Sequence, residues 1–183
     1  MGPIATTGVC AHATTIGDLA AAATAGNSSN ALTAGKYACA ATTGRYAHAL
    51  TAGKYACAAT AGKYSCAATA GEVADAVTIG DYSHATAAGD YAHATTAGGH
   101  AHALAAGLRS NASVSGENAI AVAVGANSSA RAADGGFIVL AQYNPDGDTV
   151  VAVKTAQVGK DGIKPDTWDK LSPTGEFIEA EAG

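Results

Sequence analysis

GKYACAATT GRYAHALTA GKYACAATA GKYSCAATA, residues 35–70, consists of four consecutive nonapeptides, each of which begins with a glycine. The same glycine recurs every nine residues from Gly8 to Gly125, without an insertion or a slip. A short fixed period of this kind is typical of a solenoid or another repeat array. The nonapeptide is therefore the repeating structural unit that we expect.

The columns of the repeat alternate in size when each glycine is counted as position one. Positions four and six hold only Ala or Ser, and position eight is mostly Thr, whereas positions three, five and seven vary, as in Tyr37, Cys39 and Leu50. Alternation with a period of two predicts a β-strand over positions three to eight. A helix is disfavoured because each glycine would cost it about 1 kcal/mol. The glycine and its charged follower would form the corner.

The uniformly small columns predict a thin interior between closely spaced backbones. We therefore expect an all-β fold, a parallel β-solenoid in the form of a two-sided β-roll with nine residues per strand and turn. A triangular coil of three nonapeptides is the alternative, and Ala and Ser fill such a wide interior poorly. Fourteen units in pairs, with coils ~4.8 Å apart, would give a rod roughly 34 Å long.

The sequence changes character near residue 134, where Asp134 takes the place of the next glycine. Residues 137–143 (FIVLAQY) and 149–158 (TVVAVKTAQV) are apolar and β-branched, and the intervening NPDGD predicts a hairpin turn. We expect two domains, a nonapeptide-repeat β-solenoid over 1–133 and a C-terminal β module over 134–183. The module would cap the last coil of the solenoid with a β-hairpin.

Charge and hydropathy exclude two classes of partner. Four cations, Lys36, Arg45, Lys54 and Lys63, lie before residue 72, and the net charge of the whole chain is −5. This is too little positive charge for a nucleic-acid-binding protein. The sequence contains no apolar run of ~18 residues, which a membrane span would require. The N-terminus lacks the features of a signal peptide. Neither nucleic acid nor membrane is expected as a partner.

The chain resembles a family of phage and prophage proteins that carry runs of a nonapeptide similar to T-G-D-Y-S-A-A-T. The resemblance extends to the C-terminal region, GFIVLAQYNPDGDTVVAVKTAQVGKDGIKPDTWDKL at residues 135–171. The function of the family is unknown, so the resemblance implies context and no active site. It implies a location in the host cytoplasm or on the virion.

Position five is the column in which metal ligands could gather. A two-nonapeptide coil would align His12, Asn30, His48, Cys66, His84 and His102 on one face, and Cys39, Cys57, Asp75, His93 and Asn111 on the other. Ligands in a straight line suit tetrahedral zinc poorly. A pair such as Cys66 and His84 lacks a pocket or an oxyanion hole. We therefore expect no enzyme activity, no catalytic residue, no cofactor and no metal, with a metal-binding His/Cys ladder as a minor alternative.

The tyrosines of position three are the candidate contact surface, because exposed aromatic rows are common in protein interfaces. These residues are Tyr37, Tyr46, Tyr55, Tyr64, Tyr82 and Tyr91. Their alternative role is to shield the strands and stack on one another. We expect a non-catalytic structural protein that self-associates, as a head-to-tail filament or an end-to-end dimer, through an open solenoid end or its Tyr-lined faces. The alternative is an inhibitor or decoy that binds a host protein as a nucleic-acid mimic.

Overall fold

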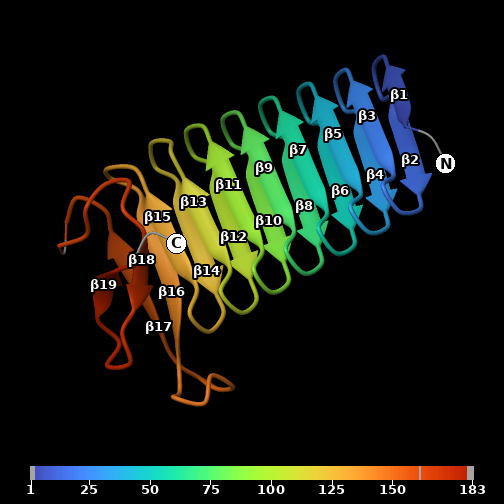
Figure 1. The fold of residues 1–183 in the computed structure, drawn as a ribbon. Helices are drawn as coiled ribbons and strands as arrows, with labels where there is room; N and C mark the ends of the chain where they lie inside the picture. Colours follow the sequence, from blue (N-terminus) through green and yellow to red (C-terminus); the bar gives the residue numbers. More distant parts are fainter. Residues whose placement is uncertain (1–2, 161, 181–183) are drawn as a thin grey trace.

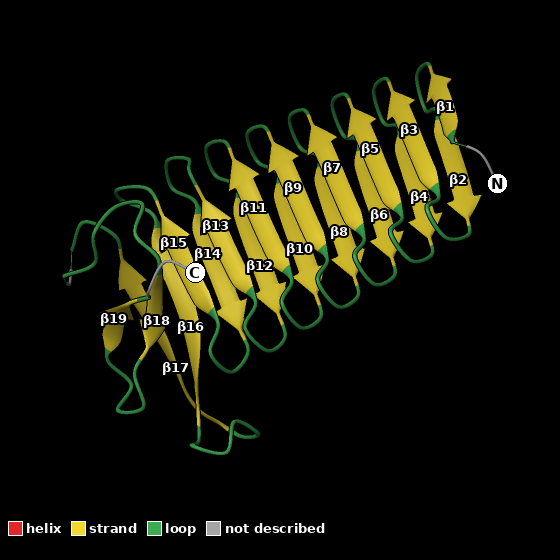
Figure 2. Cartoon of the chain, in the orientation of Figure 1, coloured by secondary structure: helices red, strands yellow, loops and turns green. Residues whose placement is uncertain are grey.

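A computed structural model describes residues 3–160 and 162–180, and the described residues form a flattened rod of parallel strands without a helix (Figures 1 and 2). Strands alternate along the chain between two sheets. Sheet A has the order β1 (Ile4–Thr7), β3 (Ala21–Ala25), β5 (Cys39–Thr43), β7 (Cys57–Ala61), β9 (Asp75–Ile79), β11 (His93–Ala97), β13 (Asn111–Val114), β15 (Ser129–Ala132), β18 (Asp169–Leu171), β19 (Phe177–Glu179). Sheet B has the order β17 (Val150–Gln157), β16 (Phe137–Tyr143), β14 (Ile120–Val124), β12 (His102–Ala106), β10 (His84–Ala88), β8 (Cys66–Ala70), β6 (His48–Ala52), β4 (Asn30–Ala34), β2 (His12–Ile16).

Each coil of the rod contains two nonapeptides. In sheet A Cys39 pairs with Cys57, and in sheet B His48 pairs with Cys66, so equivalent positions meet one coil apart. The pairing is parallel and keeps the same register from β1 to β15 and from β2 to β14. The predicted two-sided β-roll is confirmed, and the triangular alternative is excluded.

The interior consists of the small columns, as the alternation predicts. In strand β5, Ala40 and Thr42 are buried while Cys39, Ala41 and Thr43 are exposed. Ala at position six is buried in each coil from Ala13 to Ala130. Because alanine methyl groups fill the space between the sheets, the backbones can approach closely. Larger apolar side chains enter the interior near the C-terminal end, where Ile138 and Leu140 are fully buried.

The threonine hydroxyls of position eight lie inside this apolar space. Their Oγ1 atoms are buried and have no hydrogen-bond partner among the described residues: Thr15, Thr24, Thr33, Thr42, Thr51, Thr60, Thr69, Thr78 and Thr96. A buried hydroxyl without a partner is destabilising relative to an apolar group of the same shape. The next residue of the sheet A column after Thr96 is Val114, which is fully buried, so the column accepts valine.

We therefore expect Thr60→Val to raise the free energy of unfolding by about 1 kcal/mol, since it keeps the side-chain shape and removes the unpaired hydroxyl. Urea denaturation followed by circular dichroism would measure the change. Thr43→Val, at an exposed position nine, is the matched control and should change stability by less than about 0.5 kcal/mol. Destabilisation by Thr60→Val would show that the hydroxyl has a stabilising partner.

The corner glycines are required by both conformation and space. Gly53 has a φ of +146°, and a Cβ built on it would lie 2.1 Å from the carbonyl oxygen of Gly35 in the preceding coil. The same corner is paired along the rod, because the Gly53 amide donates to the carbonyl of Ala70 at 2.8 Å. Glycine at position one thus allows successive corners to stack at strand spacing.

Position three belongs to the corner, so its assignment to the strand was wrong. Tyr37, Tyr46 and Tyr55 have φ values of 58–59°, the left-handed conformation, and the strands begin at position five. The strand therefore covers positions five to nine, and the corner covers positions one to four. A consequence is that the tyrosines lie along the two edges of the rod and not on its flat faces.

The C-terminal module extends both sheets. Strand β16 adds to β14 in parallel, with Phe137 opposite Ile120, and then pairs antiparallel with β17 as the expected hairpin. In the hairpin turn, the Gly147 amide donates to the Asn144 carbonyl at 2.9 Å. On the other side, β18 pairs antiparallel with β15, and β19 pairs with β18. The module covers the last coil of both sheets, and the hairpin projects beyond the rod (Figure 1).

Candidate functional site

The two edges of the rod carry the candidate tyrosines. We call the row of corners that lead from sheet A to sheet B the Tyr46 edge, and the row that leads from sheet B back to sheet A the Tyr37 edge. In Figure 1 the Tyr46 edge is the upper row of loops and the Tyr37 edge the lower row. Since every second corner falls on the same edge, residues 18 apart become neighbours.

Four aromatic rings stack along the Tyr46 edge. The ring centroids of Tyr46 and Tyr64 are 5.2 Å apart, those of Tyr64 and Tyr82 are 5.2 Å apart, and those of Tyr82 and His100 are 5.0 Å apart. The Arg45 guanidinium lies 5.0 Å from the Tyr46 centroid, and the Lys63 ammonium lies 5.1 Å from that of Tyr82. Such cation–π contacts contribute about 0.5–1 kcal/mol each at exposed sites.

The Tyr37 edge has a shorter stack and a salt bridge. Tyr37 and Tyr55 stack with centroids 5.0 Å apart and planes 8° from parallel. Lys54 lies 5.2 Å from the Tyr55 centroid, and its Nζ is 2.8 Å from a Glu72 oxygen of the next coil. The Glu72 carboxylate raises the pKa of Lys54. The stack stops at Val73, because that corner keeps the left-handed conformation, with a φ of 55°, but carries no aromatic ring.

Tyr91 is the one candidate tyrosine that stacks on no other ring among the described residues. It lies on the Tyr37 edge between Val73 and Arg109, whose guanidinium is 5.8 Å from its ring centroid. The residue is 42% exposed, similar to the exposed fractions of Tyr37 and Tyr82. The sequence offered stacking on one another as an alternative role of the tyrosines, and the ring geometry shows it for Tyr37 with Tyr55 and for Tyr46, Tyr64 and Tyr82.

Acidic side chains at position two have a structural role in several corners. Asp81 accepts a hydrogen bond from the Gly99 amide at 3.0 Å, and Asp90 accepts one from the Leu108 amide at 2.9 Å. In each case the donor lies at position two of the next coil. These carboxylates therefore satisfy corner amides, a role that the sequence did not indicate.

The position-five columns are aligned as expected on the two flat faces. On sheet B, His84 and His102 stack with ring centroids 5.2 Å apart, next to Cys66. Burial and the neighbouring charges of His84 and His100 lower the pKa of His102, and burial raises the pKa of Cys66. Within residues 3–160 and 162–180, no three or more His, Cys, Asp or Glu side chains are grouped so that they could hold a metal ion.

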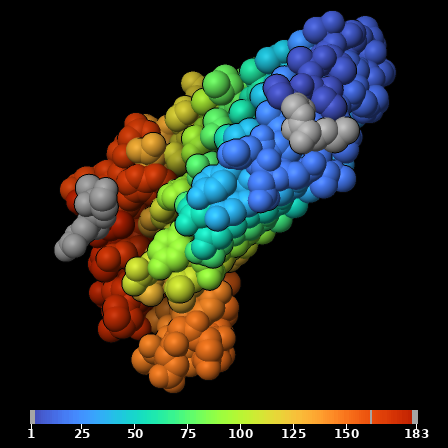
Figure 3. Space-filling model, turned by 45° about the vertical axis from the view of Figure 1, so that its right-hand side comes forward, coloured from blue at the N-terminus to red at the C-terminus, as the bar shows by residue number. Residues whose placement is uncertain are grey.

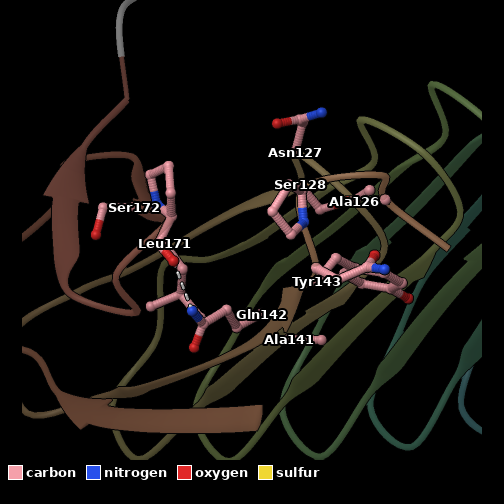
Figure 4. Close-up of a pocket in the computed structure, with 12 residues that line it drawn as sticks. Ala126, Asn127, Ser128, Ala141, Gln142, Tyr143, Leu171 and Ser172 are labelled. Atoms are coloured by element: carbon pink, nitrogen blue, oxygen red, sulfur yellow. Dashed lines mark hydrogen bonds between the residues drawn. The ribbon is translucent and has the colours of Figure 1, made fainter. Parts of the chain in front are cut away.

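A cavity of about 190 Å³ lies at the junction of the rod and the C-terminal module (Figure 4). Its walls come from the β14–β15 corner at Asn127, from Tyr143 of β16, and from Leu171 at the end of β18 with Ser172 after it. The Gln142 side chain donates to the carbonyl of Pro173 at 2.9 Å and fixes that turn. The volume is below the ~300 Å³ usual for small-molecule sites, so we do not assign a ligand to this cavity.

Asp169 is the most unusual ionisable group among the described residues. The residue is 3% exposed, and its Oδ2 atom has no hydrogen-bond partner among them. Burial, together with the charge of Glu179, raises its pKa to about 6, and the nearby Lys164 acts in the opposite direction. The residue lies where β18 joins β15, so its charge bears on the attachment of the module to the rod.

The raised pKa predicts a pH-dependent stability. Because the native carboxyl holds its proton more tightly than the unfolded one, stability should fall as the pH rises from about 4 through about 6. Asp169→Asn should remove this loss and raise the free energy of unfolding by about 1–2 kcal/mol at pH 7.5, allowing for screening, with no difference near pH 4. Urea unfolding of the variant and of the wild-type protein at both pH values measures this change in the free energy of unfolding. A difference between the two proteins that does not vary with pH would show that the Asp169 carboxyl does not titrate with a raised pKa.

Comparison of the chain with family models, with curated proteins and with solved structures finds no match. No helix of the described residues is long and apolar enough to cross a membrane.

Proposed function

We propose that this chain is a non-catalytic interaction protein of the phage or prophage type, which associates with further copies of itself through the Tyr-lined edges. The observation that supports this proposal best is the pair of exposed aromatic rows on a stiff, repetitive rod. Tyr37, Tyr55, Tyr82 and Tyr91 have 39–46% of their surface exposed. Tyrosine offers large contact area at low entropic cost, and stacking fixes these rings before a partner binds.

The corner conformation suggests a test that leaves the fold intact. Asn118 and Asn127 occupy position three at φ values of 53° and 58°, so asparagine is accepted there. We expect the wild-type protein to form a reversible oligomer in sedimentation velocity experiments. A variant with Tyr37→Asn, Tyr55→Asn, Tyr64→Asn and Tyr82→Asn should associate at least about tenfold more weakly, because the aromatic contact area is lost. A monomeric wild-type protein at all concentrations would refute the proposal.

The N-terminal end of the rod is a second route to self-association. Strands β1 and β2 hold the terminal places in the two described sheets, so one side of each is unpaired there. Val9, Ile16 and Leu19 lie around this end with 78%, 70% and 74% of their surfaces exposed. An unpaired strand edge with apolar neighbours binds a second β edge readily. Val9→Asp with Ile16→Asp should abolish association by this route, and an unchanged oligomer would exclude it.

Mimicry of nucleic acid is the weaker alternative. A mimic needs carboxylates that are free to take the place of phosphates, but Asp81 and Asp90 already accept hydrogen bonds from corner amides. Glu72 is paired with Lys54. The acidic part of the rod is therefore partly neutralised by its own structure. Recovery of a specific host protein through a contact that needs only the charged side chains of the edges, and not the tyrosines, would favour this alternative.

A further inference from the structure

The charges of the Tyr37 edge follow an ordered pattern along the rod. In four successive corners, position two is Lys36, Lys54, Glu72 and Asp90, so two cations are followed by two anions. Neighbouring corners are one coil apart, about 4.8 Å. The side chains project to solvent, and Lys54 and Glu72 are about half exposed although they form a salt bridge. If the four corners are read in the opposite direction, an anion stands at the place of each cation and a cation at the place of each anion.

Position three adds an apolar row beside these charges. The same four corners carry Tyr37, Tyr55, Val73 and Tyr91, and the tyrosines are 39–46% exposed. The row thus places exposed aromatic surface directly next to the two cations and the two anions. Aromatic residues are enriched in protein interfaces, and charges on the two partners are arranged so that they are complementary.

We propose that the Tyr37 edge binds the Tyr37 edge of a second copy of this chain, with the two rods antiparallel and related by a two-fold axis between the Lys54 and Glu72 corners. This deepens the proposed function, on which it depends, by naming the edge, the partner and the orientation. Lys54 of one copy lies opposite Glu72 of the other, and Lys36 lies opposite Asp90. Tyr37 faces Tyr91, and Tyr55 faces Val73. Each of these contacts occurs twice.

The charge pattern selects this register. A shift by one coil in one direction would place the Lys54 side chains of the two copies opposite each other. A shift by one coil in the other direction would place the Glu72 side chains of the two copies opposite each other. Like charges opposite each other are unfavourable, so both shifted arrangements are disfavoured.

The pattern also selects the orientation. Parallel rods related by an axis along their length would align each corner with its own copy, so that lysines meet lysines and carboxylates meet carboxylates. The antiparallel arrangement brings together only opposite charges. Exposed ion pairs contribute little affinity individually, but they determine which orientation and register form.

The Tyr46 edge lacks a comparable pattern. Its corresponding corners carry Arg45, Lys63, Asp81 and Gly99 at position two, so reversal gives one complementary pair, Lys63 with Asp81, and leaves Arg45 opposite a glycine. The Tyr46 edge therefore provides a control surface of similar composition on the same molecule.

The shape of the rod is compatible with this dimer. The β16–β17 hairpin projects past the Tyr37 edge at the C-terminal end of the rod (Figures 1 and 3). In the proposed register, the hairpin falls beyond the corner at Gly17 of the second copy, so it meets none of the described corners of that copy's Tyr37 edge. The four charged corners span only about 14 Å, which indicates a small, reversible interface below ~1,200 Å².

Sedimentation velocity of two complementary variants tests the proposal. The first variant, K36E/K54E, makes all four corners acidic. The second, E72K/D90N, makes them cationic or neutral, and its asparagine can still accept the hydrogen bond from Leu108. We expect each variant alone to dimerise at least about tenfold more weakly than wild type at ~20 mM NaCl, and a mixture of the two to restore a 1:1 dimer. R45E/K63E makes the same change in net charge on the Tyr46 edge and should weaken dimerisation far less than K36E/K54E does.

The outcomes separate this proposal from the proposed function. A wild-type protein that stays monomeric at ~20 mM NaCl would overturn both. A wild-type oligomer that K36E/K54E weakens no more than R45E/K63E does would overturn the antiparallel edge dimer and leave self-association standing. A mixture of the two variants without a heterodimer would also overturn it. Circular dichroism of each variant, compared with wild type, confirms that the rod is folded.

Discussion

Gly53→Ala should lower the free energy of unfolding by about 4 kcal/mol or more, or prevent folding of the rod. The new methyl group would lie 2.1 Å from the Gly35 carbonyl oxygen and 2.7 Å from its carbon, so the two coils would have to separate. The obstacle is backbone and not a flexible side chain, and the backbone is fixed by pairing to the next coil. Urea denaturation at 25 °C measures the loss.

Gly17→Ala is the matched control for this prediction. Gly17 has a similar φ of +134° on the same edge, but a Cβ built on it has no atom of residues 3–160 or 162–180 within 4 Å. The free energy of unfolding of this variant should fall only by the cost of backbone strain, about 1–3 kcal/mol. The difference between the two variants isolates the stacking of one coil on another. Equal losses would show that conformation alone, and not coil spacing, requires glycine.

Ala58→Leu should be the second most damaging substitution, with a loss of about 3 kcal/mol or more. Ala58 is fully buried at position six and is paired in the sheet with Ala40 and Ala76, so the close-packed column has no room for a larger side chain. Because the interior is only as thick as alanine side chains permit, the leucine would push the two sheets apart. The same urea experiment measures the effect.

The control for Ala58→Leu is the same substitution at the neighbouring residue, Ala59. Ala59 lies at position seven, which faces outward, and the next coil already carries Val77 in that column. Ala59→Leu should therefore change stability by less than about 0.5 kcal/mol. If both leucine variants are destabilised to the same degree, the division of the repeat into inward and outward columns is wrong.

The period and the size alternation were sufficient to predict the coil. An interior that holds only Ala and Ser at positions four and six cannot be wide, and this favoured a coil of two nonapeptides over a triangular one. The pairing of Tyr37 with Tyr55 and of His84 with His102 followed from the 18-residue coil. The rows of position five were predicted for the same reason, since parallel register aligns equivalent positions.

The position of the tyrosines was less predictable. Left-handed backbone is rare for a bulky side chain, so a tyrosine at position three suggested a strand. The signal that could have indicated the corner is in the same column, where Asn118 and Asn127 are residues that tolerate positive φ. Stacking of one ring on the next, as of Tyr37 on Tyr55, is an interaction between residues distant in the chain, so the local sequence does not reveal it.

The attachment of the C-terminal module to sheet A was also beyond sequence reasoning. Strand β18 joins β15 through a single pair, Ala130 with Asp169, and no periodic pattern leads to it. Asp169 lies in a polar segment whose composition indicates exposed turns. Its burial arises from the docking of the module on the last coil, which is a tertiary effect.

We infer that position in the nonapeptide decides whether a side chain holds the rod together or is free for contact with a partner. A leucine scan of β7 and β8, residues 57–61 and 66–70, with urea unfolding of each variant, distinguishes the two kinds of position. We expect the losses in the free energy of unfolding to alternate, with about 3 kcal/mol or more at positions six and about 0.5 kcal/mol or less at positions five, seven and nine, and with position eight also sensitive. Similar losses at adjacent positions, or losses with a period near 3.6 residues, would show that the inward and outward positions are not divided in this way.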